Sequence, residues 1–268
     1  MPAAADFAER RFQSAAAHYL TGRAPYPPEL IERVAQRLGL SQGDRLLDLG
    51  CGPGQLAMAF APLVGQVLAL DPEPQMLALA QRACSDLARS GWANVVAAPG
   101  GSADLGPHLG RFRCVVIGRA FHWMDRPETL HRLDGLLEPD GAVVLFGDER
   151  SDLPENAWVR AYEALLERYS SDDEDRRRRK STAFAPHVSV LLASPFDRLE
   201  RIGVIRRRAL GLDDLIERAL SLSSTSRARL GERTEAMIEE LTATAKSWSA
   251  DGLFTEVLTS NALIAQRS

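Results

Sequence analysis

The chain has 268 residues, 45% of them hydrophobic and 25% charged, and its formal net charge is −4. This ordinary globular composition suits one large domain. The negative balance argues against nucleic acid as the main partner, because a surface that follows phosphates needs an excess of lysine and arginine. The three cysteines have no paired spacing, so neither a zinc site nor a disulfide framework is indicated.

Neither export nor a membrane span is expected. The first six residues lack the basic start and the apolar stretch of a signal peptide. No apolar run approaches the roughly 20 residues that a spanning helix needs. We therefore expect a cytoplasmic protein with reduced thiols, no membrane partner and no metal.

The first 40 residues are expected to contain two helices. A loose apolar stripe that includes Phe7, Phe12 and Tyr19 predicts a helix over residues 4–20. The stretch 21–28 is rich in proline and turn residues and cannot continue that helix. A second helix is expected at residues 29–38.

The stretch 45–55 has the pattern of a buried strand, a glycine-rich turn and the start of a helix. Leucines make the strand apolar except at Asp48, a carboxylate that needs hydrogen-bond donors near the strand end. Gly50, Gly52 and Gly54 allow unusual backbone angles and a close approach by a ligand. The following helix points free N–H groups at this turn. The pattern predicts a site for a small polar molecule at the carboxyl end of a parallel strand.

Strands and helices alternate from this point. Strands are expected at 45–49, 66–70, 94–98, 113–118 and 142–147, and helices at 55–63, 74–89, 127–137 and 154–169. This rhythm indicates an open parallel sheet with helices on both faces and a ligand crevice where the strand order reverses.

The pattern changes after Tyr169. An acidic run and then a basic run fill residues 170–180, which favours a solvated, mobile loop, with a gating loop or a nucleic-acid patch as alternatives. A strand is expected at 199–210, helices at 212–222 and 228–248, and a last strand at 254–265. Residues 221–226 are polar enough to line a pocket, but we favour a helix end followed by the N-cap of the next helix.

The spacing of the glycines in this turn argues against a dinucleotide as the ligand. The dinucleotide fingerprint is G-x-G-x-x-G, whereas this turn is G-x-G-x-G with Gln55 after Gly54. The next strand ends in Asp71, 17 residues after Gly54, where a carboxylate can accept hydrogen bonds from two ribose hydroxyls.

These motifs resemble those of the class I S-adenosylmethionine-dependent methyltransferases. Further motifs carry the resemblance, namely Gly101-Ser-Ala-Asp104, Phe121-His-Trp-Met-Asp125 and Leu137-Glu-Pro-Asp-Gly-Ala142. The likeness is greatest to the small-molecule branch that includes the ubiquinone/menaquinone and trans-aconitate methyltransferases. It covers residues 40–148 well and the flanks loosely.

The resemblance implies S-adenosyl-L-methionine as cofactor and a role for each residue around it. Asp48 would bind the amino group, the three glycines would lie beneath the cofactor, and Asp71 would hold the ribose. The other residues placed with the cofactor are Pro72, Met76, Ala103, Asp104 and Arg119. Met76 can equally pack within its helix, and Asp104 can instead cap a helix or be an exposed loop acid. Arg119 can instead bind a carboxylate or hydroxyl of the acceptor.

The acceptor side is defined by the loop after the fourth strand and by the N-terminal segment. His122 can act as a general base, or it can hold the loop as a scaffold, which we slightly favour. Substrate contacts are expected from His18, Tyr19, Arg23, Tyr26 and Trp123. Lid packing is an equal alternative for the two tyrosines, and an exposed position is the favoured alternative for His18.

The resemblance implies one α/β domain with a doubly wound, mostly parallel, seven-stranded sheet. Its expected parts are an N-terminal helical lid at 1–40, a cofactor-binding core at 41–150, and a C-terminal part at 151–268 that completes the sheet with an antiparallel last strand and adds cap helices. The expected reaction is methyl transfer to oxygen, nitrogen or carbon of a small organic acceptor. Alternatives are an inactive cofactor-binding protein and, less favoured, an RNA methyltransferase.

Overall fold

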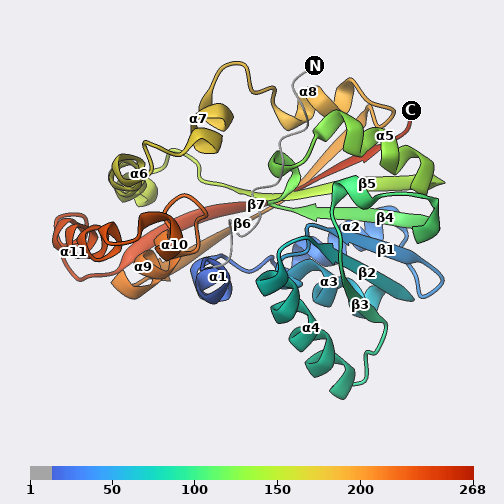
Figure 1. Cartoon of the computed structure of the whole chain (residues 1–268), viewed down its shortest axis with the longest axis horizontal. Coiled ribbons are helices and arrows are strands. Elements are labelled where there is room, and N and C mark those ends of the chain that lie inside the picture. The colour runs from blue at the N-terminus through green and yellow to red at the C-terminus, as the bar shows by residue number, and fades with distance from the viewer. Residues whose placement is uncertain (1–13) are drawn as a thin grey trace.

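A seven-stranded sheet organises the structure, a computed structural model that describes residues 14–268 (Figure 1). The strand order is β3-β2-β1-β4-β5-β7-β6. The first five strands are parallel, and β7 is antiparallel to both of its neighbours. The strands are β1 Arg45–Leu49, β2 Gln66–Asp71, β3 Val95–Pro99, β4 Phe112–Gly118, β5 Leu137–Glu149, β6 Arg198–Leu210 and β7 Phe254–Gln266. The expected doubly wound fold, including the antiparallel last strand, is confirmed.

Helices cover both faces of this sheet. On one face, α2 (Pro28–Leu38), α3 (Gln55–Phe60) and α4 (Pro74–Arg89) contribute to a core that includes Leu46 and Val116. On the other, α5 (Arg126–Leu136) and α8 (His187–Leu192) pack on a core that includes Leu47 and Val115. Adjacent strand residues thus point to opposite faces, and both are apolar because both are covered.

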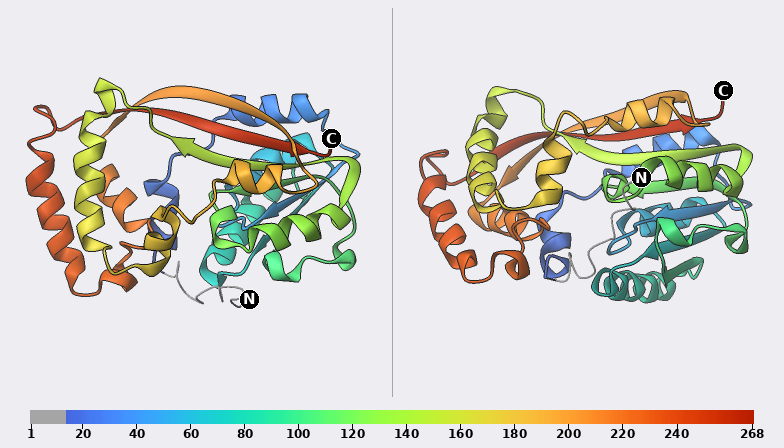
Figure 2. Two further views of the ribbon diagram at one scale, coloured as in Figure 1. Left: turned by 90° about the horizontal axis from the view of Figure 1, so that it is seen from above. Right: turned by 45° about the horizontal axis from the view of Figure 1, so that its top comes forward.

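A third apolar cluster lies outside the sheet proper and forms what we call the cap. It contains α6 (Ala157–Tyr169), α9 (Leu212–Leu220), α10 (Arg227–Leu230) and α11 (Arg233–Ala245), packed on Leu210 and Phe254. These two residues lie at the cap end of β6 and β7, whose long ribbons continue past the other strands to the cap helices (Figures 1 and 2). The cap is therefore anchored on the same strands that complete the sheet.

The expected N-terminal lid divides between the two regions. Helix α1 (Ala16–Gly22) packs against α9 of the cap, so closely that a Cβ on Gly22 would lie 2.3 Å from the carbonyl oxygen of Glu217. Helix α2 instead buries Leu30 and Val34 in the sheet core. Residues 1–13, which include Phe7 and Phe12 of the expected first helix, lie outside the described part of the chain.

The charged stretch 170–180 is a loop only over residues 170–173, and the prediction of a loop was wrong for the rest. Residues Glu174–Lys180 form helix α7, and Asp173 begins it by accepting a hydrogen bond from the Arg176 N–H at 2.7 Å. Acidic residues occupy the first turn and basic residues the last, an arrangement that complements the helix dipole. Within residues 14–268, no helix is both long and apolar enough to cross a bilayer.

Candidate active site

A cavity of about 940 Å³ lies between the carboxyl edge of the sheet and the cap. This volume is near the upper end of the range for small-molecule sites, so it has room for more than one ligand. From the core it is lined by residues that include Gly50, Gly52, Asp71, Pro72, Met76, Ala103, Asp104, Arg119, His122 and Trp123. On the opposite side, which we call the cap wall, α1, α6, α7, α9 and the residues that follow α1, β5 and α9 line it with Tyr19, Arg23, Arg150, Tyr162, Glu163, Arg176, Arg179, Lys180, Arg218, Ser223 and Ser224 among others.

The glycine turn forms the floor on the core side. Gly50, Gly52 and Gly54 have φ angles of +69°, +54° and +86°, which other residues rarely adopt. The N–H groups of Gly50 and Cys51 donate to the carbonyl of Leu70 at 2.8 and 2.9 Å, which ties the turn to β2. No atom would lie within 4 Å of a Cβ on Gly52, so this part of the backbone faces open space. Gly54 precedes α3 and does not line the cavity.

Asp48 is buried beneath this turn. Its Oδ2 accepts a hydrogen bond from the N–H of Ala57 in α3 at 2.9 Å, but its buried Oδ1 has no partner among the described residues. A small cavity of about 20 Å³ adjoins Asp48, enough for about one water. Burial raises the pKa of Asp48 to about 7, opposed by the Ala57 hydrogen bond and reinforced by Asp71. The carboxylate therefore has an unused acceptor site for a cation.

Asp71 holds the two sides of the floor together. Its Oδ2 accepts from the N–H of Gly52 at 2.7 Å, and its Oδ1 accepts from the N–H of Glu73 at 2.9 Å. Burial raises the pKa of Asp71, while these two hydrogen bonds oppose the rise. Since each carboxylate oxygen has two acceptor sites, Asp71 retains capacity for two further donors.

The far side of the floor is a short helical turn, Ser102–Asp104, that follows β3. Asp104 accepts from the N–H of Gly101 at 2.8 Å and is exposed, as is Ala103. Arg132 of α5 donates to the carbonyl of Ala103 at 2.9 Å and fixes this turn against the core. Opposite it, Pro72 and the buried side chain of Met76 supply apolar surface.

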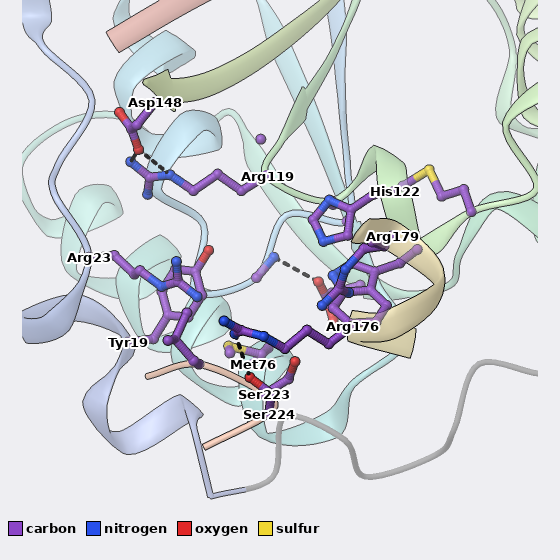
Figure 3. A pocket seen from close by; sticks show the side chains of 18 of the residues that line it. Tyr19, Arg23, Met76, Arg119, His122, Asp148, Arg176, Arg179, Ser223 and Ser224 are labelled. Atoms are coloured by element: carbon purple, nitrogen blue, oxygen red, sulfur yellow. Dashed lines mark hydrogen bonds and ion pairs between the residues drawn. The ribbon is translucent and has the colours of Figure 1, made fainter. Parts of the chain in front are cut away.

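Arg119 is held inside the protein by several contacts. It forms an ion pair with Asp148 (Figure 3). The guanidinium also donates to the carbonyl of Ala24 at 2.7 Å and lies 4.3 Å above the ring of Tyr26. It also has a φ of +56°, the one non-glycine residue with positive φ in the described chain. Arg119 joins the lid segment to β4 and β5, and its buried Nη1 has no hydrogen-bond partner among the described residues.

His122 lies in the cavity wall beside Trp123, with ring centroids 4.8 Å apart. Burial, together with the charges of Arg179, His187, Arg23 and Arg126, lowers the pKa of His122 to about 3. An imidazole with this pKa is neutral near pH 7 but is a weak base. The environment thus opposes the general-base alternative.

The remaining predicted positions are His18, Tyr26 and the stretch 221–226. His18 is ion-paired with Glu217 of α9, 2.9 Å from Nδ1 to Oε2, and does not line the cavity. Tyr26 packs on Phe146 and borders only the small cavity at Asp48. The stretch 221–226 runs from the C-cap of α9 at Ser221 to the N-cap position of α10 at Ser226, as favoured, although the Ser226 side chain makes no cap bond. Ser223 and Ser224 between them line the main cavity, so the stretch fits the pocket-lining alternative as well.

Helix α7 brings to the site three residues that the sequence pattern did not single out. Arg176 and Arg179 extend from it into the cavity, and Lys180 lines it as well (Figure 3). Glu167 of α6 accepts from Arg176 at 2.7 Å and from Lys180, which seats the helix. Arg179 lies 4.1 Å above the ring of Trp123. The run of basic residues at 176–180 was visible in the sequence, but the sequence did not show that three of these side chains line the cavity.

The family described as "Methyltransferase domain" matches residues 46–141. An uncharacterised methyltransferase of Mycobacterium tuberculosis is 28% identical over 235 residues, covering 87% of this chain and 86% of the relative. An S-adenosylmethionine-dependent methyltransferase from Geobacter sulfurreducens, solved with S-adenosyl-L-homocysteine, aligns over 97% of this chain and 98% of its own with a TM-score of 0.56 and 18% identity. A corresponding complex from Thiobacillus denitrificans aligns over 96% and 98% with a TM-score of 0.55 and 16% identity.

The two structures share the fold, and the family match lies over β1 to β5, the part of the chain that carries the glycine turn, Asp48 and Asp71. The narrower likeness to the quinone and trans-aconitate enzymes stays a prediction. Residues 46–141 thus match the methyltransferase domain, and over most of its length the chain is similar to proteins described as methyltransferases, including S-adenosylmethionine-dependent ones.

Proposed function

We propose that this enzyme transfers the methyl group of S-adenosyl-L-methionine to a small organic acceptor bound between core and cap. The observation that carries the proposal is the continuous cavity of about 940 Å³, which runs from the glycine turn to the cap helices. Sites for single small molecules begin at roughly 300 Å³. The volume thus suits a cofactor at the core edge together with an acceptor against the cap.

The core edge supplies the cofactor site in this proposal. When bound, the cofactor supplies a methyl group on a sulfonium sulfur, and its transfer leaves the electron pair of the broken carbon–sulfur bond on that sulfur. The unpartnered Oδ1 of Asp48 accepts from the cofactor's amino group, directly or through one water in the adjoining cavity. The open backbone at Gly52 lies beneath the ligand, and Asp71 accepts from the two ribose hydroxyls.

The adenine lies toward the Ser102–Asp104 turn. Asp104 accepts from the adenine amino group, Ala103 lies beside it, and Pro72 and Met76 pack on the ring. This assignment is supported by the position of these residues along one side of the cavity, next to Asp71. Arg23 and Tyr19 close the opposite side from α1 and the residue after it.

The acceptor is one that needs no proton removed by histidine. A general base is most effective when its pKa lies near the working pH, whereas burial and neighbouring cations hold the pKa of His122 near 3. We assign His122 and Trp123 to the wall that orients the acceptor. Catalysis then rests on proximity and alignment, which suits an acceptor that is already ionised or a neutral amine.

Two other functions compete with this one. A binding protein that retained the cofactor site but lost catalysis would bind S-adenosyl-L-homocysteine without turnover. An RNA methyltransferase is opposed by the net charge of −4 and by the absence of the Asn/Asp-Pro-Pro-aromatic motif after β4, where the chain has Arg119-Ala-Phe-His.

The test begins with calorimetric titration of the protein with S-adenosyl-L-homocysteine and, separately, with NAD. We expect saturable binding of the first and none of the second, because Gln55 breaks the dinucleotide pattern. Methyl-labelled cofactor is then incubated with a metabolite panel and with total RNA. Label in a small molecule supports the proposal. Binding without any transfer supports the inactive alternative, and label in RNA supports the other.

A further inference from the structure

We propose that the cap wall of the cavity binds an anionic group, and that the acceptor is therefore a small carboxylic acid. This inference rests on the proposed function and assigns a substrate class to the same site. Among the described residues, the cap side of the cavity is lined by six cations and by one carboxylate, Glu163. The six are Arg23, Arg150, Arg176, Arg179, Lys180 and Arg218.

The strongest part of this positive wall is organised by a buried glutamate. Glu256 of β7 is fully buried, and Arg150, Arg208 and Arg218 all converge on its carboxylate. Arg150 Nε lies 2.6 Å from Oε1, Arg218 Nη1 2.9 Å from Oε1, and Arg208 Nη1 3.6 Å from Oε2. Because one carboxylate cannot neutralise three guanidinium groups, this cluster keeps a positive excess.

Two arginines of that cluster carry its positive charge to the cavity surface. Arg150 and Arg218 line the cavity, whereas Arg208 does not. Arg218 Nη1 is buried and makes no well-directed hydrogen bond. Burial raises the pKa of the Tyr162 hydroxyl in the same wall, and the charges of Arg218, Arg150 and Arg23 oppose this rise. The three guanidinium groups therefore lie around one part of the cavity.

Arg23 adds a cation that has no carboxylate partner in the described part of the chain. Its one hydrogen bond is a long one of 3.4 Å to the carbonyl of Ser221, and its buried Nε has no partner among residues 14–268. Burial lowers the pKa of Arg23, and the nearby Arg119 and Arg218 lower it further. A buried charge without a counter-ion is costly, so an anion that enters here is stabilised.

The cofactor does not account for this charge. Its single carboxylate can pair with one cation, for which Arg23 is suitably placed beside Tyr19 at the core end of the wall. The Arg150–Arg218 pair then remains for the acceptor. A carboxylate is the ligand that paired guanidinium donors suit.

Apolar side chains in the same wall define the rest of the acceptor. Val159, Tyr162, Leu166 and Leu222 line the cavity beside the arginines. An inorganic anion would leave this surface in water, whereas a carboxylic acid with a hydrocarbon or aromatic skeleton would cover it. Positive charge and apolar surface together favour a monocarboxylic or similarly compact organic acid.

The test uses Arg150→Gln, because Arg150 is partly exposed and Glu256 keeps two arginine partners without it. Benzoate and hexanoate are titrated into the complex with S-adenosyl-L-homocysteine, and benzamide, hexanamide and phenyl phosphate serve as matched probes. Arg150→Lys keeps the charge. Arg160→Gln removes an arginine whose side chain is exposed on α6 and pairs with Asp152.

We expect the carboxylates to bind the wild-type complex at least about tenfold more tightly than their amides, and Arg150→Gln to remove this preference. Arg150→Lys should retain part of it and Arg160→Gln all of it. The affinity for S-adenosyl-L-homocysteine should be equal in all four proteins. Equal binding of acid and amide, preference for phenyl phosphate, or an unchanged preference in Arg150→Gln overturns the inference. Loss of S-adenosyl-L-homocysteine binding by wild type would instead refute the proposed function.

Discussion

The core edge and the cap wall differ in the groups that face the cavity, which are mainly backbone in the first and side chains in the second. At the core edge, backbone groups in a turn of three positive-φ glycines meet two carboxylates that are themselves fixed by backbone N–H groups. In the cap wall, long basic side chains converge from α7, α9 and the residues that follow β5 and α1. A backbone site has one geometry and suits one invariant ligand, whereas a wall of side chains can change its specificity without changing the fold.

The largest expected effect comes from adding a single methyl group to the backbone site. Gly50→Ala would place a Cβ 2.7 Å from the Cβ of Ala120 in addition to straining a φ of +69°. Gly52→Ala would strain a φ of +54° but would meet open space. We expect Gly50→Ala to lose roughly 2–4 kcal/mol of stability and Gly52→Ala about 1–2 kcal/mol, measured by urea denaturation without ligand.

A site outside the cavity calibrates this comparison. Gly39, which ends α2, has a φ of +62°, and a Cβ added to it would meet open space. Gly39→Ala should therefore match Gly52→Ala in stability while leaving the affinity for S-adenosyl-L-homocysteine unchanged. Equal stability of Gly50→Ala and Gly52→Ala would show that the contact with Ala120 is relieved by movement of the loop.

The next effect concerns the core edge alone and is a dependence of protein stability on pH that Asp48 causes. Burial raises the pKa of Asp48 from 3.8 to about 7, so the folded protein binds a proton more readily than the unfolded chain. Stability of the ligand-free protein should thus fall as pH rises from about 4 to about 7. Asp48→Asn removes this dependence and should be more stable than wild type at pH 8, on the order of 1–3 kcal/mol.

Urea denaturation of both proteins at pH 5 and pH 8 checks this expectation. The same Asn variant should bind S-adenosyl-L-homocysteine more weakly at pH 8, because it lacks the charge that faces the amino group. Parallel pH profiles of stability in the two proteins would mean that Asp48 ionises normally and that its burial is compensated elsewhere.

The different construction of the two regions also explains what could be predicted from the sequence. The strand, the glycine turn, Asp48 and Asp71 lie within short local patterns, and β2 follows β1 as its neighbour in the sheet. The cap has no such local code. Glu256 is one residue in an alternating strand, and its partners Arg150, Arg208 and Arg218 come from separate elements.

The 170–180 stretch illustrates the same limit. Its charges alone favoured a solvated loop, but the alternation from acidic first turn to basic last turn stabilises α7, and Glu167 seats it from another helix. His18 was likewise expected to contact the substrate, but its side chain pairs with Glu217, which lies 199 residues away in the sequence. Contacts of this kind depend on the tertiary fold and leave no signal in spacing.

A smaller effect is expected at His122, where the two walls meet. With its pKa held near 3, the imidazole stays neutral between pH 5 and pH 9. His122→Asn should keep the maximal methyl-transfer rate within about tenfold, and the pH–rate profile should have no limb near pH 6.5. A loss of about 10²-fold or more in the Asn variant, the range of general-base catalysis, would make His122 a base. His122→Ala removes the packing on Trp123 as well and should lower the rate further.

The smallest effect is expected at the ion pairs that link α7 to α6. Glu167, whose side chain is 40% exposed, pairs with Arg176 and Lys180, and ion pairs exposed to this degree contribute roughly 0–1 kcal/mol. Glu167→Gln should change overall stability by less than about 1 kcal/mol but should speed tryptic cleavage within α7. Asp152→Asn, which breaks an exposed pair with Arg160, is the matched control. Equal cleavage rates in both would show that α7 is seated by other contacts.

The division of labour between core and cap is tested most directly by the dissociation constant of S-adenosyl-L-homocysteine for wild type, Asp71→Ala and Arg150→Gln, measured side by side by calorimetry. Asp71→Ala removes charge-assisted acceptors of the ribose hydroxyls and should weaken binding at least about tenfold. Arg150→Gln should stay within about twofold of wild type. Unchanged binding in Asp71→Ala, or an equal loss in Arg150→Gln, would contradict a cofactor site confined to the core edge.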